Sequence, residues 1–406
     1  MAASRMPLAG RVTLLSLFFA WGIVAVLVRM TVPHFRETFD LGYRDALLVQ
    51  SAFFVTYLLF ARVSGSIVAR IGLRSSVVLG ICLMAAGSLW LAVATLWQAF
   101  YALLPAIFVM ATGITFLQVA ANPLAAVEGG LKTTQANLTF AQGFNSLGTV
   151  AAPLVAAAAF LGAAEEPLAP VRWLFGLIFV LLVVLAFAAR ALLAEGHQPT
   201  TGSSVPEKRM DGFEKKRLIA GVAALFLYVG AEVSISTTLV NLLEADGVIA
   251  AGRTASALLT SIFWIGMMVG RFSSVPLLDR FDRRLILGGS ALACATLCLL
   301  AAFGGGNVAA AAILASGLFA GLQFPTIFAI SSADLQPGAR ARAAGWLCTG
   351  IVGGGIVPLL YGEVADRVSI EFALVVPMVC FAAIAMFAVA FGQDRVSRPE
   401  AIPARP

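Results

Sequence analysis

The sequence predicts an all-α membrane protein of twelve transmembrane helices in two pseudo-symmetric halves of six. Three observations support this fold class. Apolar residues make up 60% of the 406 positions and charged residues only 12%, a composition typical of membrane proteins. Apolar runs of about 20 residues recur, each long enough as a helix to cross the hydrocarbon of a bilayer. The third observation is a weak repeat at half the chain length.

The apolar runs define the helices, because short polar stretches separate them. We predict helices over 10–36, 45–70, 74–94, 97–128, 134–160, 170–193, 215–243, 253–278, 284–303, 307–332, 338–364 and 370–391. One longer polar stretch, 194–214, is rich in Gly, Ser, Pro and basic residues. Such a composition indicates a linker, here between an N-terminal half, 1–193, and a C-terminal half, 215–406.

The repeat is visible in the positions of glycine and proline. Gly148 precedes Pro153 in the fifth predicted helix by the same offset as Gly353 precedes Pro358 in the eleventh. In the fourth helix a Leu-Gln pair precedes a proline, and the tenth helix has the same order. Internal repeats of this kind are typical of secondary transporters, whose substrate site lies between the repeats.

Lys and Arg residues are distributed unequally between the two sides of the membrane. With the N-terminus in the cytoplasm, the cytoplasmic side receives the linker cluster and most other basic residues, Arg271 and Arg280 among them. The outer side receives only Arg36, Arg44, Arg172, Arg253 and Arg367. This asymmetry predicts a multi-pass protein of the cell inner (plasma) membrane with both termini cytoplasmic.

Several function classes find no support in the sequence. It has no phosphate-binding loop, and its two histidines and five cysteines form no metal-ligand or catalytic pattern. The net charge of +6 comes from basic residues at helix ends, which does not indicate nucleic-acid binding. We therefore expect no enzyme activity, no cofactor and no metal, and a monomer that binds a small-molecule substrate within the lipid bilayer.

The fourth predicted helix holds the first candidate site residues. Gln118 and Asn122 stand four positions apart and share a helix face, and Pro123 weakens the backbone bonding of the preceding turn. Amides within a membrane are costly unless they face protein or water. We predict that this face looks into a polar cavity between helices.

Other polar and aromatic residues within the apolar segments extend this candidate site. Amides bind hydroxyl groups as donors and acceptors, and aromatic rings cover the apolar faces of sugar rings. The alternative is that the amides join helices and that the tryptophans lie in interface belts. The candidate substrate-binding residues are Trp21, Arg29, Gln50, Gln118, Asn122, Gln142, Asn145, Trp264, Gln323 and Trp346.

Four charged residues raise separate questions. Arg29 either reaches the membrane interface or a charged partner, or faces the cavity and binds a carboxylate or hydroxyls. Glu232 lies in mid-helix, where an ionised carboxyl is costly, and either carries a proton or pairs structurally. Asp279 and Arg280 follow the eighth predicted helix and are candidates for gating, with a surface ion pair as the alternative.

Taken together, these features resemble the major facilitator superfamily, and short motifs extend the resemblance to one subfamily. FFAWG (18–22), VPHF (32–35), FDL (39–41), LQVAANP (117–123), NLTFAQGFNSLG (137–148), YVGAEVSI (228–235) and FPTIF (324–328) resemble the fucose/glucose–galactose permease family of sugar–proton symporters. The resemblance implies sugar uptake by alternating access, driven by protons or, in some relatives, by sodium.

The chain departs from this family at the positions that the resemblance would assign to proton coupling. Where the family has Asn-Asp in the first helix, the chain has Val28-Arg29, and Gln118 replaces the acid of the fucose permeases. Ala69 replaces a loop acid that Asp279 keeps in the second half. The acid expected in the first helix is thus replaced by a permanent cation.

We predict a sugar transporter, secondary active or facilitative, with a proton or sodium as its candidate co-transported ion and Glu232 as the remaining acid. Three alternatives stay open. Arg29 could recruit an anionic sugar acid or another organic anion. The protein could export a drug or a metabolite, since this fold does not fix the substrate. It could also act as a receptor without transport.

Overall fold

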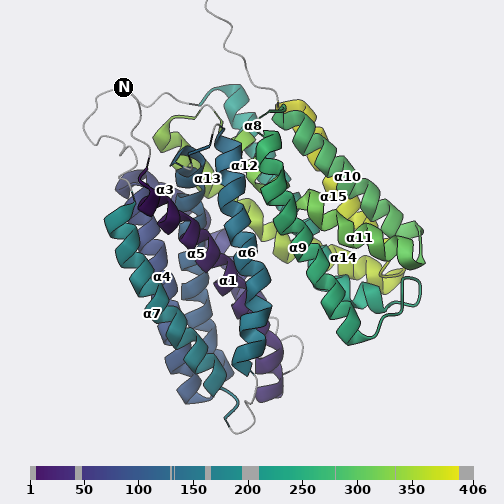
Figure 1. Ribbon diagram of the computed structural model, residues 1–406, viewed down its shortest axis with the longest axis horizontal. Helices are drawn as coiled ribbons and strands as arrows, with labels where there is room; N and C mark the ends of the chain where they lie inside the picture. Colours follow the sequence, from purple (N-terminus) through teal and green to yellow (C-terminus); the bar gives the residue numbers. More distant parts are fainter. Residues whose placement is uncertain are drawn as a thin grey trace, which may run out of the picture.

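The computed structural model describes residues 6–41, 48–128, 130–131, 133–160, 166–193, 210–278, 280–333 and 335–392. Helices make up nearly all of this part of the chain, and they form two bundles that lie side by side (Figure 1). No strand occurs among the described residues.

The first bundle contains six long helices. In it, α4 packs against α5 and α7, and α1 packs against α6. A 3-10 turn, η1 (Thr95–Trp97), extends α4. The helices are α1 (Leu8–Thr38), α3 (Leu48–Ile71), α4 (Leu73–Ala94), α5 (Phe100–Glu128), α6 (Thr134–Phe160) and α7 (Ala169–Leu192).

The second bundle has the same number of crossings, but two of them are interrupted helices. In it, α10 packs against α11 and α15, and α8 packs against α14. The elements are α8 (Gly212–Glu244), α9 (Arg253–Leu278), α10 (Arg283–Phe303), α11 (Gly306–Ala320), α12 (Gln323–Ser331), α13 (Pro337–Thr349), η2 (Gly350–Val352), α14 (Gly353–Arg367), η3 (Phe372–Leu374) and α15 (Val375–Phe391).

The predicted all-α fold of two six-helix halves is confirmed. Eleven helical segments among the described residues are long and apolar enough to cross a membrane. Helix α6 supplies the twelfth crossing, and polar side chains over its first half lower its hydropathy. The predicted helices 307–332 and 338–364 are each divided, the first between α11 and α12 and the second at η2. Most of the predicted linker 194–214 lies outside the described residues, so the domain boundaries stay a prediction.

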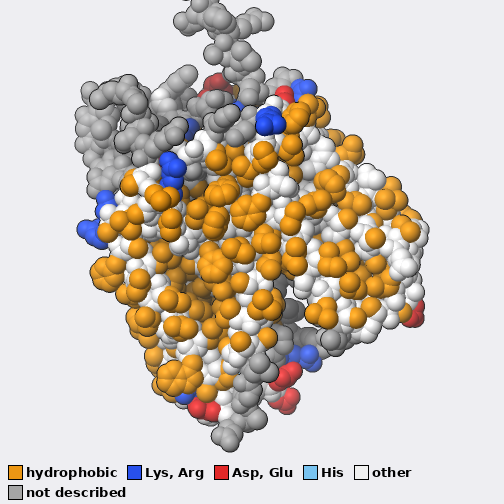
Figure 2. All heavy atoms as spheres, viewed as in Figure 1, with side chains coloured by type: hydrophobic (Ala, Val, Ile, Leu, Met, Phe, Trp, Pro, Cys, Tyr) orange, Lys and Arg blue, Asp and Glu red, His pale blue; other side chains and the backbone are white. Residues whose placement is uncertain are grey.

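The outer surface of the bundles is apolar, as a lipid-facing surface requires. Leu154, Trp173 and Phe187 are each more than 70% exposed. Hydrophobic side chains cover most of the visible face, and charged side chains gather near its two ends (Figure 2). An apolar band between charged ends is the arrangement that burial in a bilayer predicts.

The two bundles touch closely at one end. A Cβ added to Gly65 of α3 would lie 3.0 Å from the Cα of Gly345 in α13. A Cβ added to Gly143 of α6 would lie 2.6 Å from the ring of Phe272 in α9. These contacts lie toward the end where α7 finishes and α8 begins, and the ribbons diverge toward the opposite end (Figure 1).

Candidate functional site

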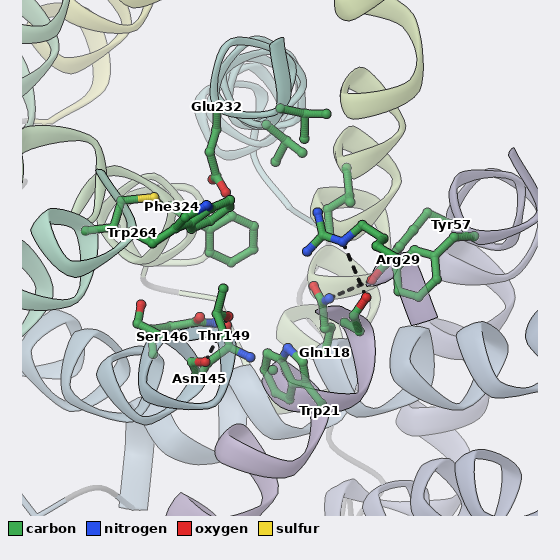
Figure 3. Close-up of a pocket in the computed structure, with 18 of the residues that line it drawn as sticks. Trp21, Arg29, Tyr57, Gln118, Asn145, Ser146, Thr149, Glu232, Trp264 and Phe324 are labelled. Carbon is green, nitrogen blue, oxygen red and sulfur yellow. Dashed lines mark hydrogen bonds between the residues drawn. The ribbon is translucent and has the colours of Figure 1, made fainter. Parts of the chain in front are cut away.

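A cavity of about 160 Å³ lies between the two bundles. The first bundle lines it with residues of α1, α3, α5 and α6, and the second with residues of α8, α9, α12 and η2. Side chains from both bundles point toward the same space (Figure 3). Because both bundles contribute, a bound molecule would contact both halves of the protein at once.

Two amides present acceptors on the first-bundle side. Gln118 of α5 donates from Nε2 to the hydroxyl of the buried Tyr57 at 2.6 Å. Asn145 of α6 donates from Nδ2 to the carbonyl oxygen of Phe18 at 3.1 Å. Among the described contacts, the carbonyl oxygen of each amide accepts no hydrogen bond. The NH2 group of each amide therefore fixes its side chain in place, and the carbonyl oxygen stays available to accept a hydrogen bond from a ligand.

Aromatic rings line the cavity from both bundles. Trp21 of α1 packs on Phe18, with ring centroids 4.4 Å apart. Trp264 of α9 meets Phe263 edge to face at 5.6 Å, and Phe324 of α12 lies near it (Figure 3). Neighbouring rings fix the two tryptophans, which gives the cavity rigid apolar surfaces beside its amides.

Two opposite charges point into the cavity from different bundles. Arg29 of α1 and Glu232 of α8 are both half-buried, and their charged ends face the same space (Figure 3). The Nε of Arg29 donates to the carbonyl oxygen of Ala25 at 3.3 Å. No salt bridge joins Arg29 to Glu232 among the described contacts. Arg29 thus faces the cavity rather than the membrane interface, the other position that the sequence allowed.

Arg271 of α9 is a cavity residue that the sequence analysis assigned only to the cytoplasmic charge of the chain. Its side chain is 7% exposed. Its Nε donates to the carbonyl oxygen of Gly321 at 2.8 Å, in the break between α11 and α12. Its Nη1 donates to Gln142 O at 3.1 Å and to Ser146 Oγ at 2.6 Å, both in α6. Arg271 therefore joins the two bundles within the cavity wall itself.

Seven of the predicted site residues lie together in the cavity wall. They come from five helices on both sides and include both candidate charges. These residues are Trp21, Arg29, Gln118, Gln142, Asn145, Glu232 and Trp264.

Asn122 and Gln323, also predicted as site residues, are fully buried and do not line the cavity. Asn122 Oδ1 accepts a hydrogen bond from Gln142 Nε2 at 3.0 Å. One helical turn, about 5–6 Å along α5, separates Asn122 from Gln118, and Asn122 lies outside the cavity wall. Gln323 Nε2 lies 3.4 Å from Cys294 Sγ within the second bundle. Both amides join helices, which is the alternative that the sequence left open.

Trp346 does not line the cavity either. It is 43% exposed, and the guanidinium of Arg62 lies over its ring, 3.9 Å from the ring centroid. Its contact is between α13 and α3, outside the cavity wall. The side chain of Gln50 and all of Asp279 lie outside the described residues. Arg280 is exposed just after α9, and its gating role stays a prediction.

Two tyrosines line the cavity that the sequence analysis did not select. Tyr57 holds Gln118, and Tyr228 lies one helical turn before Glu232. The hydroxyl of Tyr228 is buried and has no hydrogen-bond partner in the described structure. The sequence did offer a signal for both residues, because each is a tyrosine within an apolar run. A tyrosine hydroxyl buried there needs a hydrogen-bond partner, which makes such a residue a candidate for a polar site.

The sequence and structure match known transporters over most of their length. Residues 12–357 match the Major Facilitator Superfamily. A glucose/galactose transporter of Brucella abortus is 34% identical, with 91% of each chain aligned. An L-fucose-proton symporter of Escherichia coli is 28% identical over 92% of this chain and 91% of its own.

Solved structures agree with the sequence matches. The crystal structure of FucP, a major facilitator transporter in the outward conformation, superposes with a TM-score of 0.81 at 26% identity. The match covers 95% of this chain and 99% of that one. A bacterial homologue of the iron transporter ferroportin, at 15% identity and a TM-score of 0.76, shares the fold alone. The chain therefore belongs to the major facilitator superfamily, in the group that contains the glucose/galactose transporters and the L-fucose–proton symporters.

Proposed function

We propose that this protein carries a sugar across the inner membrane by alternating access, as a monomer with both termini in the cytoplasm, and that it is not an enzyme. The observation that carries the proposal is the cavity between the bundles, where amide acceptors lie beside tryptophan rings. Amides bind sugar hydroxyls, and the rings cover the apolar faces of the sugar. The transport functions of the relatives support the same assignment.

The position of the cavity suits transport rather than storage or sensing. Gln118 and Asn145 bind from the first bundle, and Trp264 binds from the second. A substrate held by both bundles can favour their joint rearrangement, which is what alternating access requires. With both termini cytoplasmic, the closed end of the bundles faces the cytoplasm and the cavity is reached from outside.

Ion coupling, where it occurs, runs through Glu232. Arg29 and Gln118 hold the positions where the family resemblance places proton-carrying acids, and neither side chain exchanges a proton in the physiological range. Glu232 is the acid among the described residues of the cavity wall. A cycle driven by protons or sodium would therefore use this carboxylate, whereas facilitated diffusion would not need it.

Uptake into proteoliposomes tests the proposal. The full-length protein is reconstituted, and exchange of labelled sugars is followed with and without imposed proton and sodium gradients. We expect saturable sugar exchange and, if transport is coupled, accumulation that disappears in Glu232→Gln while exchange persists. Absence of exchange for every neutral and acidic sugar tested would refute the transport function.

A further inference from the structure

We infer that the preferred substrate is a hexuronate, a six-membered sugar ring that carries a carboxylate, and that Arg29 binds this carboxylate. The inference rests on the proposed sugar transport and adds the charge of the substrate to it. Three observations support it: the net charge of the cavity, the open donors of Arg29, and the hydroxyl-binding groups around them.

The charge of the cavity wall is unbalanced. Its described lining contains two arginines, Arg29 and Arg271, and one acid, Glu232. The negative charge of Glu232 balances one of the two arginines, so the cavity wall keeps one positive charge. Within the described part of the chain neither arginine forms a salt bridge. An uncompensated charge in a region of low dielectric is costly, and an anionic ligand removes that cost.

The two arginines differ in how many of their donors are used. Arg271 directs Nε and Nη1 to two carbonyl oxygens and a hydroxyl, so backbone and side-chain groups hold it in place. Arg29 makes one described hydrogen bond, from Nε to Ala25 O at 3.3 Å. Its terminal nitrogens point into the cavity (Figure 3). A guanidinium with open terminal donors suits the two oxygens of a carboxylate.

The groups around Arg29 select a sugar rather than a simple organic acid. Gln118 and Asn145 each keep an open carbonyl oxygen, which accepts from a hydroxyl. Glu232, across the cavity, adds a further acceptor. Trp21 and Trp264 supply apolar surfaces from the two bundles. A small acid without hydroxyl groups would leave these acceptors unpaired, at a cost in affinity.

Binding to the purified full-length protein tests the inference without any mutation. Glucuronate and galacturonate are compared with glucose, galactose and lactate by titration calorimetry. We expect at least one of the two hexuronates to bind at least about tenfold more tightly than the matching hexose. The same hexuronate should also bind at least about tenfold more tightly than lactate. A hexose that binds as tightly as its uronate overturns the inference and leaves sugar transport standing. Lactate binding equal to the uronates also overturns it, and failure of every sugar to bind overturns both proposals.

Arg29→Gln then assigns the effect to one side chain. The substitution removes the charge and keeps hydrogen-bonding capacity, so we expect hexuronate affinity to fall at least about tenfold more than hexose affinity does. Arg367→Gln is the matched control, because this arginine is 76% exposed and pairs with Glu363 on α14, away from the cavity. Equal hexuronate affinity in Arg29→Gln and Arg367→Gln would assign recognition elsewhere and overturn the role of Arg29.

Discussion

At the scale of single residues, the helix face alone does not decide which polar side chain reaches the cavity. Gln118 and Asn122 share a face of α5, yet Gln118 lines the cavity and Asn122 is covered by Gln142. Trp264 and Trp346 both lie within apolar segments, but only Trp264 borders the cavity. The sequence identified these residues as polar or aromatic within the membrane. It could not identify their neighbours, because these come from other helices.

The two tryptophans therefore give a matched pair of variants. Trp264→Ala removes an apolar surface from the cavity, and we expect sugar affinity to fall several-fold, since aromatic contacts of this kind contribute about 0.5–1.5 kcal/mol. Trp346→Ala removes a ring that contacts Arg62 outside the cavity, and equilibrium affinity should not change. Titration calorimetry measures both. Equal losses of affinity in the two variants would contradict the assignment of Trp264 to the site.

Arg271 shows why one site residue was missed. Charge counting places basic residues at the cytoplasmic side, and Arg271 lies inside the predicted helix 253–278 but toward that end. The structure buries it between α6 and the break that separates α11 from α12. Its partners at Gly321 and Gln142 are backbone carbonyl oxygens, which no side-chain pattern in the sequence reveals.

At the scale of elements, hydropathy predicted nearly every helix within a few residues. The ends were predictable because apolar runs stop where charge or glycine begins. The interruptions were not, because a broken helix keeps its apolar composition. The carbonyl oxygen of Gly321 is turned to Arg271, and a Cβ at Gly321 would lie 2.3 Å from Met267 O. The break therefore depends on contacts with α9, a different part of the chain.

The close approach of α3 and α13 yields a prediction about conformation. A Cβ at Gly345 would lie 2.6 Å from Ala61 O, so Gly345→Ala should push the two helices apart and destabilise the closed end. We expect the opposite end to close in compensation. Spin labels at the exposed positions Glu37 and Asp246, at the ends of α1 and α8, would then show a shorter mean distance.

The control for this experiment uses the same substitution where space is open. Gly362 of α14 has no atom within 4 Å of an added Cβ, so Gly362→Ala should leave the label distance unchanged. A distance distribution that is the same in Gly345→Ala as in the unsubstituted protein would show that the α3–α13 contact does not control the conformation.

At the scale of the whole molecule, two bundles enclose one cavity and meet at one end. Thr133 Oγ1, before α6, donates to the carbonyl oxygen of Leu278, at the end of α9, at 3.5 Å. This contact joins the bundles at the closed end. The sequence predicted the two halves from their repeat, but relative placement of the halves depends on contacts such as this one, between residues far apart in the chain.

A tether across this end should separate binding from transport. Cysteines at the exposed positions Thr134 and Arg280, in a background with exposed Cys82 replaced by serine, can be joined by a short bismaleimide with a cleavable disulfide. We expect the tethered protein to bind substrate with unchanged affinity and to stop transporting it, because the closed end cannot open. Reduction should restore uptake to the level before tethering. Undiminished transport by the tethered protein would mean that this end does not open in the cycle.

The unequal charges of the cavity also decide how the membrane potential acts on the cycle. Two arginines and one glutamate give the empty cavity a charge of +1, and a bound hexuronate brings it to zero. A membrane potential that is negative inside favours the inward-facing state of the empty carrier. The free-energy difference is up to about 2.3 kcal/mol for one charge that crosses a potential of 100 mV. If a proton accompanies the substrate on Glu232, the loaded and empty cavities carry the same charge. The potential then favours the inward step of the loaded carrier by as much as it opposes the outward return of the empty one, so the complete cycle moves no net charge. A single glutamate would thereby allow an anion to enter a negatively charged cell.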